Sequence, residues 1–262
     1  NTIKSLYLTN PTNNSAVQIT GLFINNFTGG TNIISRNNIH SFGILSPTNT
    51  LSVITGIDCG GGVSNYFNNT INLGIDSNGN SITQPVLLRG ITKGTASNNN
   101  FYYNSVYIGG SNVAVGVATQ STFAFVRGTT GTDQVRNNIF INERSNAVAG
   151  GLLKHYAIRL STGIATLTIN NNDYYGVGND GILGSVSGID YPTFAGFQGV
   201  TLQDVNSLNE SVNFINATGN AASKNMHINV FIPTGIDNGA SNIVGITNDI
   251  DLDVRQGNVG YL

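Results

Sequence analysis

The densest group of acidic residues lies near the end of the sequence, at Asp249, Asp251 and Asp253. In an extended segment alternate side chains point to the same side, so these three carboxylates could offer oxygen ligands to Ca²⁺. The spacing lacks the glycine and the distal glutamate of a helix-loop-helix calcium loop. The segment is therefore a candidate Ca²⁺ site, and the alternative is a solvated turn in which Asp253 faces Arg255.

An enzyme that cleaves polysaccharides needs reactive groups that face each other across one bond. A hydrolase of this kind uses two carboxylates roughly 5–10 Å apart. The other acidic residues considered for this role, Asp133, Glu143 and Asp173, fall at different phases of the repeat described below. We therefore predict no catalytic residues, and a carbohydrate-active enzyme, either a lyase or a hydrolase, stays open as the alternative.

Two charged pairs within one repeat, Glu143–Arg144 and Lys154–His155, could converge in the folded chain. We expect all four residues to be polar residues of the surface. The three histidines lie far apart in the sequence and lack the spacing of metal ligands. The single cysteine, Cys59, excludes an internal disulfide, and its apolar neighbour Ile57 favours a place in the interior.

The elements that carry these residues follow a repeat of about 34 residues. Asparagines recur with gaps of 31, 35, 34 and 34 residues, at Asn38, Asn69, Asn104, Asn138 and Asn172. Small residues recur in a second series with gaps of 35, 34, 34 and 33 residues, at Gly21, Gly56, Gly90, Ala124 and Ala157. A fixed period in this range indicates a repeat architecture, and two independent series make chance a poor explanation.

The residue types of the repeat favour strands over helices. Residues around each asparagine are rich in Ile, Val, Phe, Tyr and Thr, which suit a half-buried pleated surface. Charged residues make up only 9% of the chain and glycines number 33, whereas helical repeats of this length need long amphipathic runs of Ala, Leu, Glu and Lys. We therefore predict an all-β fold, a right-handed parallel β-helix with about 34 residues per coil and an irregular C-terminal cap.

We expect one domain, with coils over residues 1–184 and the final coil or coils and the cap over residues 185–262. The period stops near Gly176, and the terminal units of a repeat protein are expected to be atypical. In each coil the asparagine of the first series should occupy a corner, because asparagine tolerates the left-handed backbone region. Stacked asparagines should then form a ladder of amide hydrogen bonds.

The composition narrows the classes of partner. The formal net charge is −2, from 11 basic and 13 acidic residues, and no basic patch is present, so nucleic acid is not expected as a partner. No run approaches the 18 or so apolar residues of a membrane-spanning helix. Low charge, abundant Asn, Ser, Thr and Gly, and scarce Cys, Met and Trp suit a secreted or cell-surface, extracellular protein.

Several segments carry a family resemblance: the Asn-Asn-x-Ile/Phe motifs, the stretch Lys154–Ile158 and the later segments 204–208, 226–229 and 249–255. They resemble the right-handed parallel β-helix regions of large secreted bacterial surface proteins. The resemblance covers most of the chain. It is specific for architecture and poor for activity, since many such regions have no assigned function.

The sequence therefore predicts a non-enzymatic, extracellular structural or adhesive β-helix protein. The open ends of a β-helix expose unpaired strands, which further copies could cover to build a surface filament. The expected partners are copies of the chain or other cell-surface components, with glycans as a further candidate. The alternative is a carbohydrate-active enzyme or a glycan-binding module, and apart from the candidate Ca²⁺ no cofactor is expected.

Overall fold

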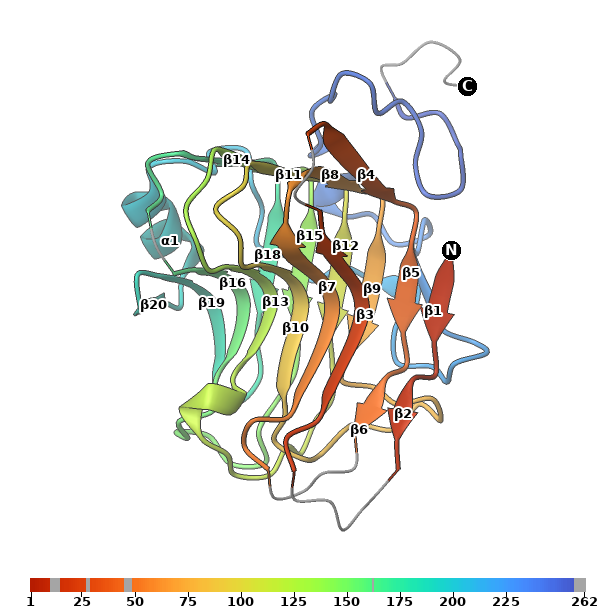
Figure 1. The fold of residues 1–262 in the computed structure, drawn as a ribbon, viewed down its shortest axis with the longest axis vertical. Coiled ribbons are helices and arrows are strands. Elements are labelled where there is room, and N and C mark those ends of the chain that lie inside the picture. The colour runs from red at the N-terminus through yellow and green to blue at the C-terminus, as the bar shows by residue number, and fades with distance from the viewer. Residues whose placement is uncertain (10–14, 27–28, 45–48, 162, 257–262) are drawn as a thin grey trace.

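The structure is a computed structural model that describes residues 1–9, 15–26, 29–44, 49–161 and 163–256. This part of the chain forms a β-solenoid of about 5 turns with parallel strands (Figure 1). Each full coil gives one strand to each of three sheets, first the seven-stranded, then the five-stranded and then the six-stranded sheet. The pairing is parallel throughout these sheets except between β19 and β20, which are antiparallel. The predicted stack of coils of about 34 residues is confirmed, and its right-handed sense stays a prediction.

The three sheets run along the stack. The six-stranded sheet has the spatial order β1 (Thr2–Lys4), β5 (Asn38–His40), β9 (Thr70–Leu73), β12 (Ser105–Ile108), β15 (Ile139–Asn142) and β18 (Asp173–Gly176). The five-stranded sheet has the order β4 (Thr31–Ser35), β8 (Val63–Phe67), β11 (Asn99–Tyr102), β14 (Asp133–Arg136) and β17 (Leu167–Asn170). The seven-stranded sheet has the order β3 (Gln18–Asn25), β7 (Val53–Gly61), β10 (Leu87–Lys93), β13 (Thr122–Arg127), β16 (His155–Leu160), β19 (Gly181–Val186) and β20 (Ile189–Tyr191).

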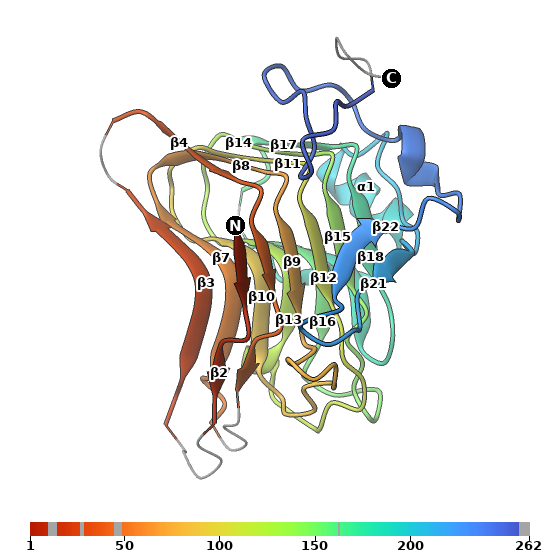
Figure 2. The ribbon, with the colours of Figure 1, turned by 90° about the vertical axis from the view of Figure 1, so that its right-hand side faces the viewer.

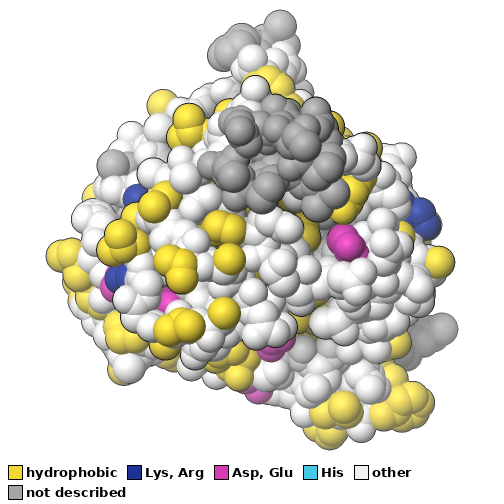
Figure 3. All heavy atoms as spheres, turned by 90° about the horizontal axis from the view of Figure 1, so that it is seen from below, with side chains coloured by type: hydrophobic (Ala, Val, Ile, Leu, Met, Phe, Trp, Pro, Cys, Tyr) yellow, Lys and Arg dark blue, Asp and Glu magenta, His cyan; other side chains and the backbone are white. Residues whose placement is uncertain are grey.

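Short elements complete the described fold. Two further strand pairs are present, β2 (Tyr7–Leu8) with β6 (Gly43–Ile44) and β21 (Phe214–Asn216) with β22 (Asn225–Ile228). The helices are α1 (Phe194–Thr201) and the 3₁₀ helices η1 (Ala118–Gln120) and η2 (Gly235–Asn238). Seen from below, the molecule shows only scattered charged side chains among polar and hydrophobic ones (Figure 3).

The second sequence series marks where the seven-stranded sheet passes closest to the six-stranded sheet. A Cβ added to Gly56 would lie 2.6 Å from Ile71 Cγ2, and one added to Gly90 would lie 2.2 Å from Val106 Cγ1. The later positions of the series hold alanines that are fully buried. Small residues are therefore needed here because any larger side chain would force the two sheets apart.

Like residues stack on like residues in the interior. A continuous column of rings runs through it, with centroids 5.0–6.1 Å apart, formed by Tyr66, Phe101, Phe125, Phe140, Tyr174 and Phe197. Neighbouring coils lie about 4.8 Å apart, so rings from successive coils can stack in contact. Two of the rings, Phe125 and Phe140, come from the same coil, on β13 and β15. Stacked and edge-to-face ring pairs add to the free energy gained from burial alone.

The asparagine ladder is present at the corner between the five-stranded and six-stranded sheets. The amide of Asn69 donates to Asn104 Oδ1 at 2.9 Å, and the same oxygen accepts the backbone N–H of Asn69 at 3.1 Å. The Asn104 amide repeats this arrangement with Asn138, and Asn138 repeats it with Asn172. The second amide hydrogen of each is also used: Asn104 donates it to Tyr66 O at 2.9 Å.

The first member of the ladder is Asn37 and not the expected Asn38. Asn37 donates to Asn69 Oδ1 at 2.8 Å, whereas Asn38 aligns with Thr70 and its side chain accepts a hydrogen bond from the Thr70 hydroxyl. The first gap of the ladder, from Asn37 to Asn69, is therefore 32 residues and not 31. The ladder ends at Ser207, whose hydroxyl accepts the backbone N–H of Asn172.

We predict that Asn104→Ala lowers the free energy of unfolding by about 2–4 kcal/mol, because it leaves two buried donors of Asn69 and the carbonyl of Tyr66 without partners. Chemical denaturation measures this difference. The control is Asn100→Ala, which removes one hydrogen bond to Asn65 from a half-buried position and should cost under about 1 kcal/mol. Equal losses in the two variants would contradict the role of the ladder.

A buried ion cluster joins the seven-stranded and five-stranded sheets. Asp133 Oδ2 lies 2.9 Å from Lys93 Nζ and 2.6 Å from Arg127 Nε, and all three side chains are fully buried. Lys93 and Arg127 are in register on neighbouring strands, so one carboxylate balances two stacked cations. Backbone carbonyls of residues 129–131 and 163 accept their remaining hydrogens.

Asp133→Asn should destabilise the fold by about 3–5 kcal/mol, because it leaves two buried cations without their shared counter-ion. Thermal or chemical denaturation measures the loss. Asp190→Asn is the matched control: Asp190 pairs with Lys154 at 2.5 Å, but both side chains are partly exposed, so its removal should cost at most about 1 kcal/mol. A small effect at Asp133 would show that the cluster is dispensable.

The two ends of the stack differ. At the last coil, α1 buries Phe197 against the interior. The Gln203 side chain makes the hydrogen bonds that a further strand would make with β17: it accepts from Ile169 N and donates to Leu167 O. At the first coil, β1, β3 and β4 are the terminal strands of their sheets. Phe23 and Ile33 are 58% and 67% exposed there. The described part of the chain therefore covers one end and leaves strand edges at the other (Figure 1).

Candidate functional site

The segment after the last coil folds back over the outer side of the six-stranded sheet. Figure 2 shows β21 and β22 in front of that sheet. Val212 and Met226 of this segment pack on Tyr107 and Ile141, which point outward from β12 and β15, in a second small hydrophobic core. Lys224 donates to Asn72, and Lys4 donates to Ala221 O. The segment therefore reaches back to the first coil.

A column of corner residues meets the rest of this segment. The residue before each ladder asparagine has a positive φ between 53° and 60°, and these residues are Arg36, Asn68, Tyr103, Asn137 and Asn171. We call them the corner column. They, and not the ladder asparagines as expected, hold the left-handed conformation. This conformation suits asparagine and is unfavourable for arginine and tyrosine, so their presence at two positions calls for a compensating contact.

The corner column supplies those contacts by holding residues 236–255, which we call the strap. Asn171 donates to Gly239 O at 2.8 Å, and the Tyr103 hydroxyl donates to Ser241 O at 2.8 Å. Asn137 both donates to Ser241 O and accepts from its backbone N–H.

At the far end of the strap, Arg36 donates to Asp249 O at 3.0 Å and Asn68 donates to Asn248 O at 2.8 Å. Arg255, on the strap itself, donates to Asn68 Oδ1 at 2.6 Å. The strap is thus fixed at every coil from the last to the first.

Between the strap, β22 and the six-stranded sheet lies a groove of about 750 Å³. Its floor is formed by the first residue of each strand of that sheet, one per coil, namely Thr2, Asn38, Thr70, Ser105, Ile139 and Asp173. The corner column forms one wall, and residues 224–228 and 230 form the other. Because the coils are stacked, the floor offers one side chain about every 4.8 Å.

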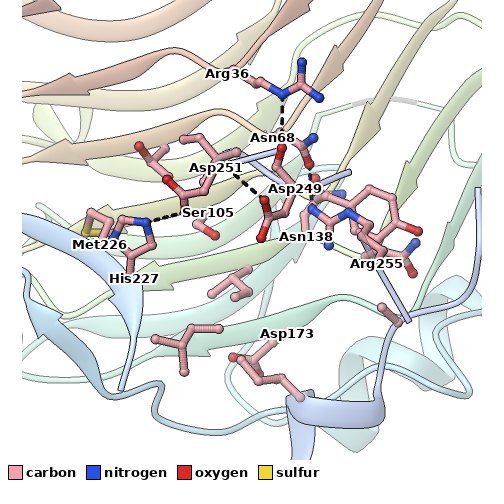
Figure 4. A pocket seen from close by; sticks show the side chains of 18 of the residues that line it. Arg36, Asn68, Ser105, Asn138, Asp173, Met226, His227, Asp249, Asp251 and Arg255 are labelled. Carbon is pink, nitrogen blue, oxygen red and sulfur yellow. Dashed lines mark hydrogen bonds and ion pairs between the residues drawn. The ribbon is translucent and has the colours of Figure 1, made fainter. Parts of the chain in front are cut away.

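One contact spans the groove. His227 Nε2 on β22 lies 2.7 Å from Asp251 Oδ2 on the strap, and both side chains are about half exposed. Figure 4 shows this pair, with Asp173 at the opposite end of the groove from Arg36 and Asn68. The pair therefore bridges the groove, and Asp173 lies on the floor between Ile139 and Leu208, which also line it.

Asp173 is the most perturbed acidic group of the groove. It is 2% exposed, and burial raises its pKa to about 7, with a further contribution from the charge of Glu210. Its Oδ1 accepts the backbone N–H of Glu210 at 3.0 Å, whereas its Oδ2 is buried without a hydrogen-bond partner. A buried titratable group in a cleft is a candidate functional residue.

The raised pKa of Asp173 predicts a pH-dependent stability. The folded state holds the proton more tightly than the unfolded state, so this group contributes most below pH 4 and its contribution is lost as pH rises towards 7. The variant Asp173→Asn cannot ionise at this position, so it does not lose this stability as the pH rises. Its free energy of unfolding, relative to that of the wild type, should increase by on the order of 3 kcal/mol between pH 4 and pH 8. Denaturation at several pH values tests this, and parallel curves would contradict it.

The candidate Ca²⁺ residues do not gather into a site. Asp249 Oδ1 accepts the backbone N–H groups of Asp251 and Asp253, and Asp251 pairs with His227. In the described ranges no group of three or more His, Cys, Asp or Glu residues is placed to hold a metal ion. The segment forms a turn that closes with the Asp249 N–H donating to Asp253 O. Arg255 turns to Asn68 and lies over the Tyr103 ring.

The two charged pairs, Glu143–Arg144 and Lys154–His155, are only partly at the surface. Arg144 is fully buried and donates to Ile82 O at 2.7 Å and Gln84 O at 3.0 Å. His155 is also fully buried, and burial lowers its pKa to about 3. The expectation of surface positions is therefore wrong for both residues. Arg144 holds the connection that follows β9, and the Glu143 carboxylate accepts the hydroxyl of Tyr107.

Comparison of the chain with models of protein families, with curated proteins and with solved structures finds no match. Within the described residues, none of the helices has the length and apolar character needed to cross a membrane. The assignment of function therefore depends on the geometry of the groove.

Proposed function

We propose that this chain is a non-enzymatic, adhesive β-solenoid of the extracellular surface that holds a linear glycan in the groove. The observation that carries the proposal is the floor, where successive coils present hydroxyl and amide side chains in register, among them Thr70 and Ser105. Such groups both donate and accept hydrogen bonds, which suits a ligand rich in hydroxyls. The polar, weakly charged composition supports the extracellular location.

The backbone around the groove favours a glycan over an extended peptide. Peptides often bind by adding a strand to a free sheet edge. The strands β5, β9, β12 and β15 beneath the groove are each paired on both sides. On β22 the backbone N–H of His227 is already taken by Asn225 Oδ1 at 2.9 Å. Side chains, and not main-chain pairing, would therefore make most of the contacts.

Hydrogen bonds and not ring stacking would give the specificity. Tyr103 is the aromatic residue that lines the groove, and its ring face carries the guanidinium of Arg255 at 3.9 Å from the ring centroid. Its hydroxyl is committed to Ser241 O. Apolar side chains such as Ile139 and Met226 line the remaining surface and can contact the C–H faces of sugar rings.

The elements that cover the last coil disfavour self-assembly into a filament. A head-to-tail filament needs open strand edges at both ends, whereas α1 and Gln203 cover the last coil. Association between copies through the edge strands β1, β3 and β4 would therefore stop at a pair of molecules. We place the adhesive role ahead of the filament for this reason.

A carbohydrate-active hydrolase is the second candidate, and one observation favours it. The pKa of Asp173, raised to about 7 by burial, is that of a group able to act as a general acid. A hydrolase also needs a second carboxylate across the bond. Asp249 and Asp251 are engaged in the strap turn and in the pair with His227, and this favours binding without cleavage.

The test is a binding panel of neutral, acidic and amino-sugar oligosaccharides, measured by calorimetry on the purified chain. Ser105→Trp places a bulky ring on the floor and should weaken binding of the recognised glycan at least tenfold. Thr168→Trp is the matched control, because Thr168 is an exposed strand residue of the five-stranded sheet, outside the groove, and it should bind as wild type does.

Two results would overturn this proposal. The first is a panel in which no glycan binds, and the second is binding that survives Ser105→Trp unchanged. The appearance of new reducing ends after prolonged incubation of a glycan with the protein would show cleavage. If the variant Asp173→Asn produced none, a hydrolase would replace the adhesive role. Circular dichroism of each variant checks that the solenoid is intact.

A further inference from the structure

The base of the groove holds a carboxyl oxygen that nothing in the described part of the chain satisfies. Asp173 Oδ2 is buried and has no hydrogen-bond partner among the described residues, while Oδ1 accepts the backbone N–H of Glu210. Buried polar atoms in native proteins are almost always paired. An unpaired carboxyl oxygen that lines a groove is therefore a position where a ligand's donor would bind.

The surroundings of Asp173 define the chemistry of that donor. In the neighbouring coils the residues aligned with Asp173 are Ile139 on one side and Leu208 on the other, and all three line the groove. The charged neighbour that affects Asp173 most is another acid, Glu210. A negative charge between apolar side chains and beside a second acid is stabilised by a cation.

The geometry points to a subsite for a primary ammonium group at Asp173, supplied by an amino sugar of the glycan in the groove. This inference rests on the proposed function and names its ligand class. An ammonium is compact and carries three donors, so it is the smallest organic cation able to satisfy the buried Oδ2. The hydroxyls of the neighbouring sugars would then lie over Ser105 and Thr70, along the same row of floor residues.

Other cations fit this position less well. Ca²⁺ takes six to eight oxygen ligands, whereas no acidic or histidine cluster able to hold a metal is found among the described residues. A guanidinium is planar and prefers a bidentate carboxylate, but one oxygen of Asp173 is already used by Glu210 N. A lysine side chain could supply the same ammonium, and it is an outcome of the test.

The experiment compares three oligosaccharides of equal length and linkage, the β-1,4-linked oligomers of glucosamine, N-acetylglucosamine and glucose. They differ only in an amine, an acetamide or a hydroxyl at one position. Calorimetry near pH 6.5 should give at least tenfold tighter binding of the glucosamine oligomer to wild type. Asp173→Asn should abolish this preference, so that the glucosamine and glucose oligomers bind the variant within about twofold of each other.

Asp190→Asn is the matched control, since it removes a partly exposed carboxylate that does not line the groove, and it should keep the preference for the amine. Equal binding of all three oligomers, lost in Ser105→Trp, would overturn the ammonium subsite and leave the proposed function standing. A lysine-containing peptide is tested in the same way, and tighter binding of this peptide than of the glucosamine oligomer would overturn the assignment of an amino sugar as the ligand. Absence of all binding would overturn both proposals.

Discussion

The amide ladder at one corner of each coil is the interaction on which the rest of this structure depends. The inner ladder asparagines use their amide hydrogens and their oxygen between coils, for example Asn104 with Tyr66 O, Asn138 Oδ1 and the donors of Asn69. The ladder satisfies polar groups in a corner that is closed to water, and it permits only one register. It thereby aligns the aromatic column inside and the groove floor outside.

The same corner produces the groove. Because every coil turns through a left-handed residue just before its ladder asparagine, five side chains project in a row on the outside. These side chains hold the strap by its backbone carbonyls. Tyr103 and Arg36 accept an unfavourable backbone conformation there, and the strap contacts offset its cost. A structural repeat therefore becomes a binding surface once the C-terminal segment lies across it.

The buried charges limit what the solenoid can do. Lys93, Arg127 and Asp133 fix the junction of two sheets, and Arg144 fixes a loop through backbone carbonyls. None of these four side chains is exposed, so they act on stability and register. Asp173 differs because its carboxyl lines a groove and has an oxygen without a partner.

The sequence by itself determined the solenoid, its period and four of the five ladder positions, because a local pattern repeated in every coil is amplified by stacking. It placed Asn38 where Asn37 stands, since the first gap of the ladder is only 32 residues and both neighbouring positions hold asparagine. Only the tertiary structure decided the groove. The strap joins residues such as Asn68 and Asn248, 180 positions apart, and no periodicity links them. The burial of Arg144 and His155 also depends on tertiary packing. Nothing in the sequence around them predicts the hydrogen bonds that Arg144 makes with a backbone carbonyl and His155 makes with a side-chain amide.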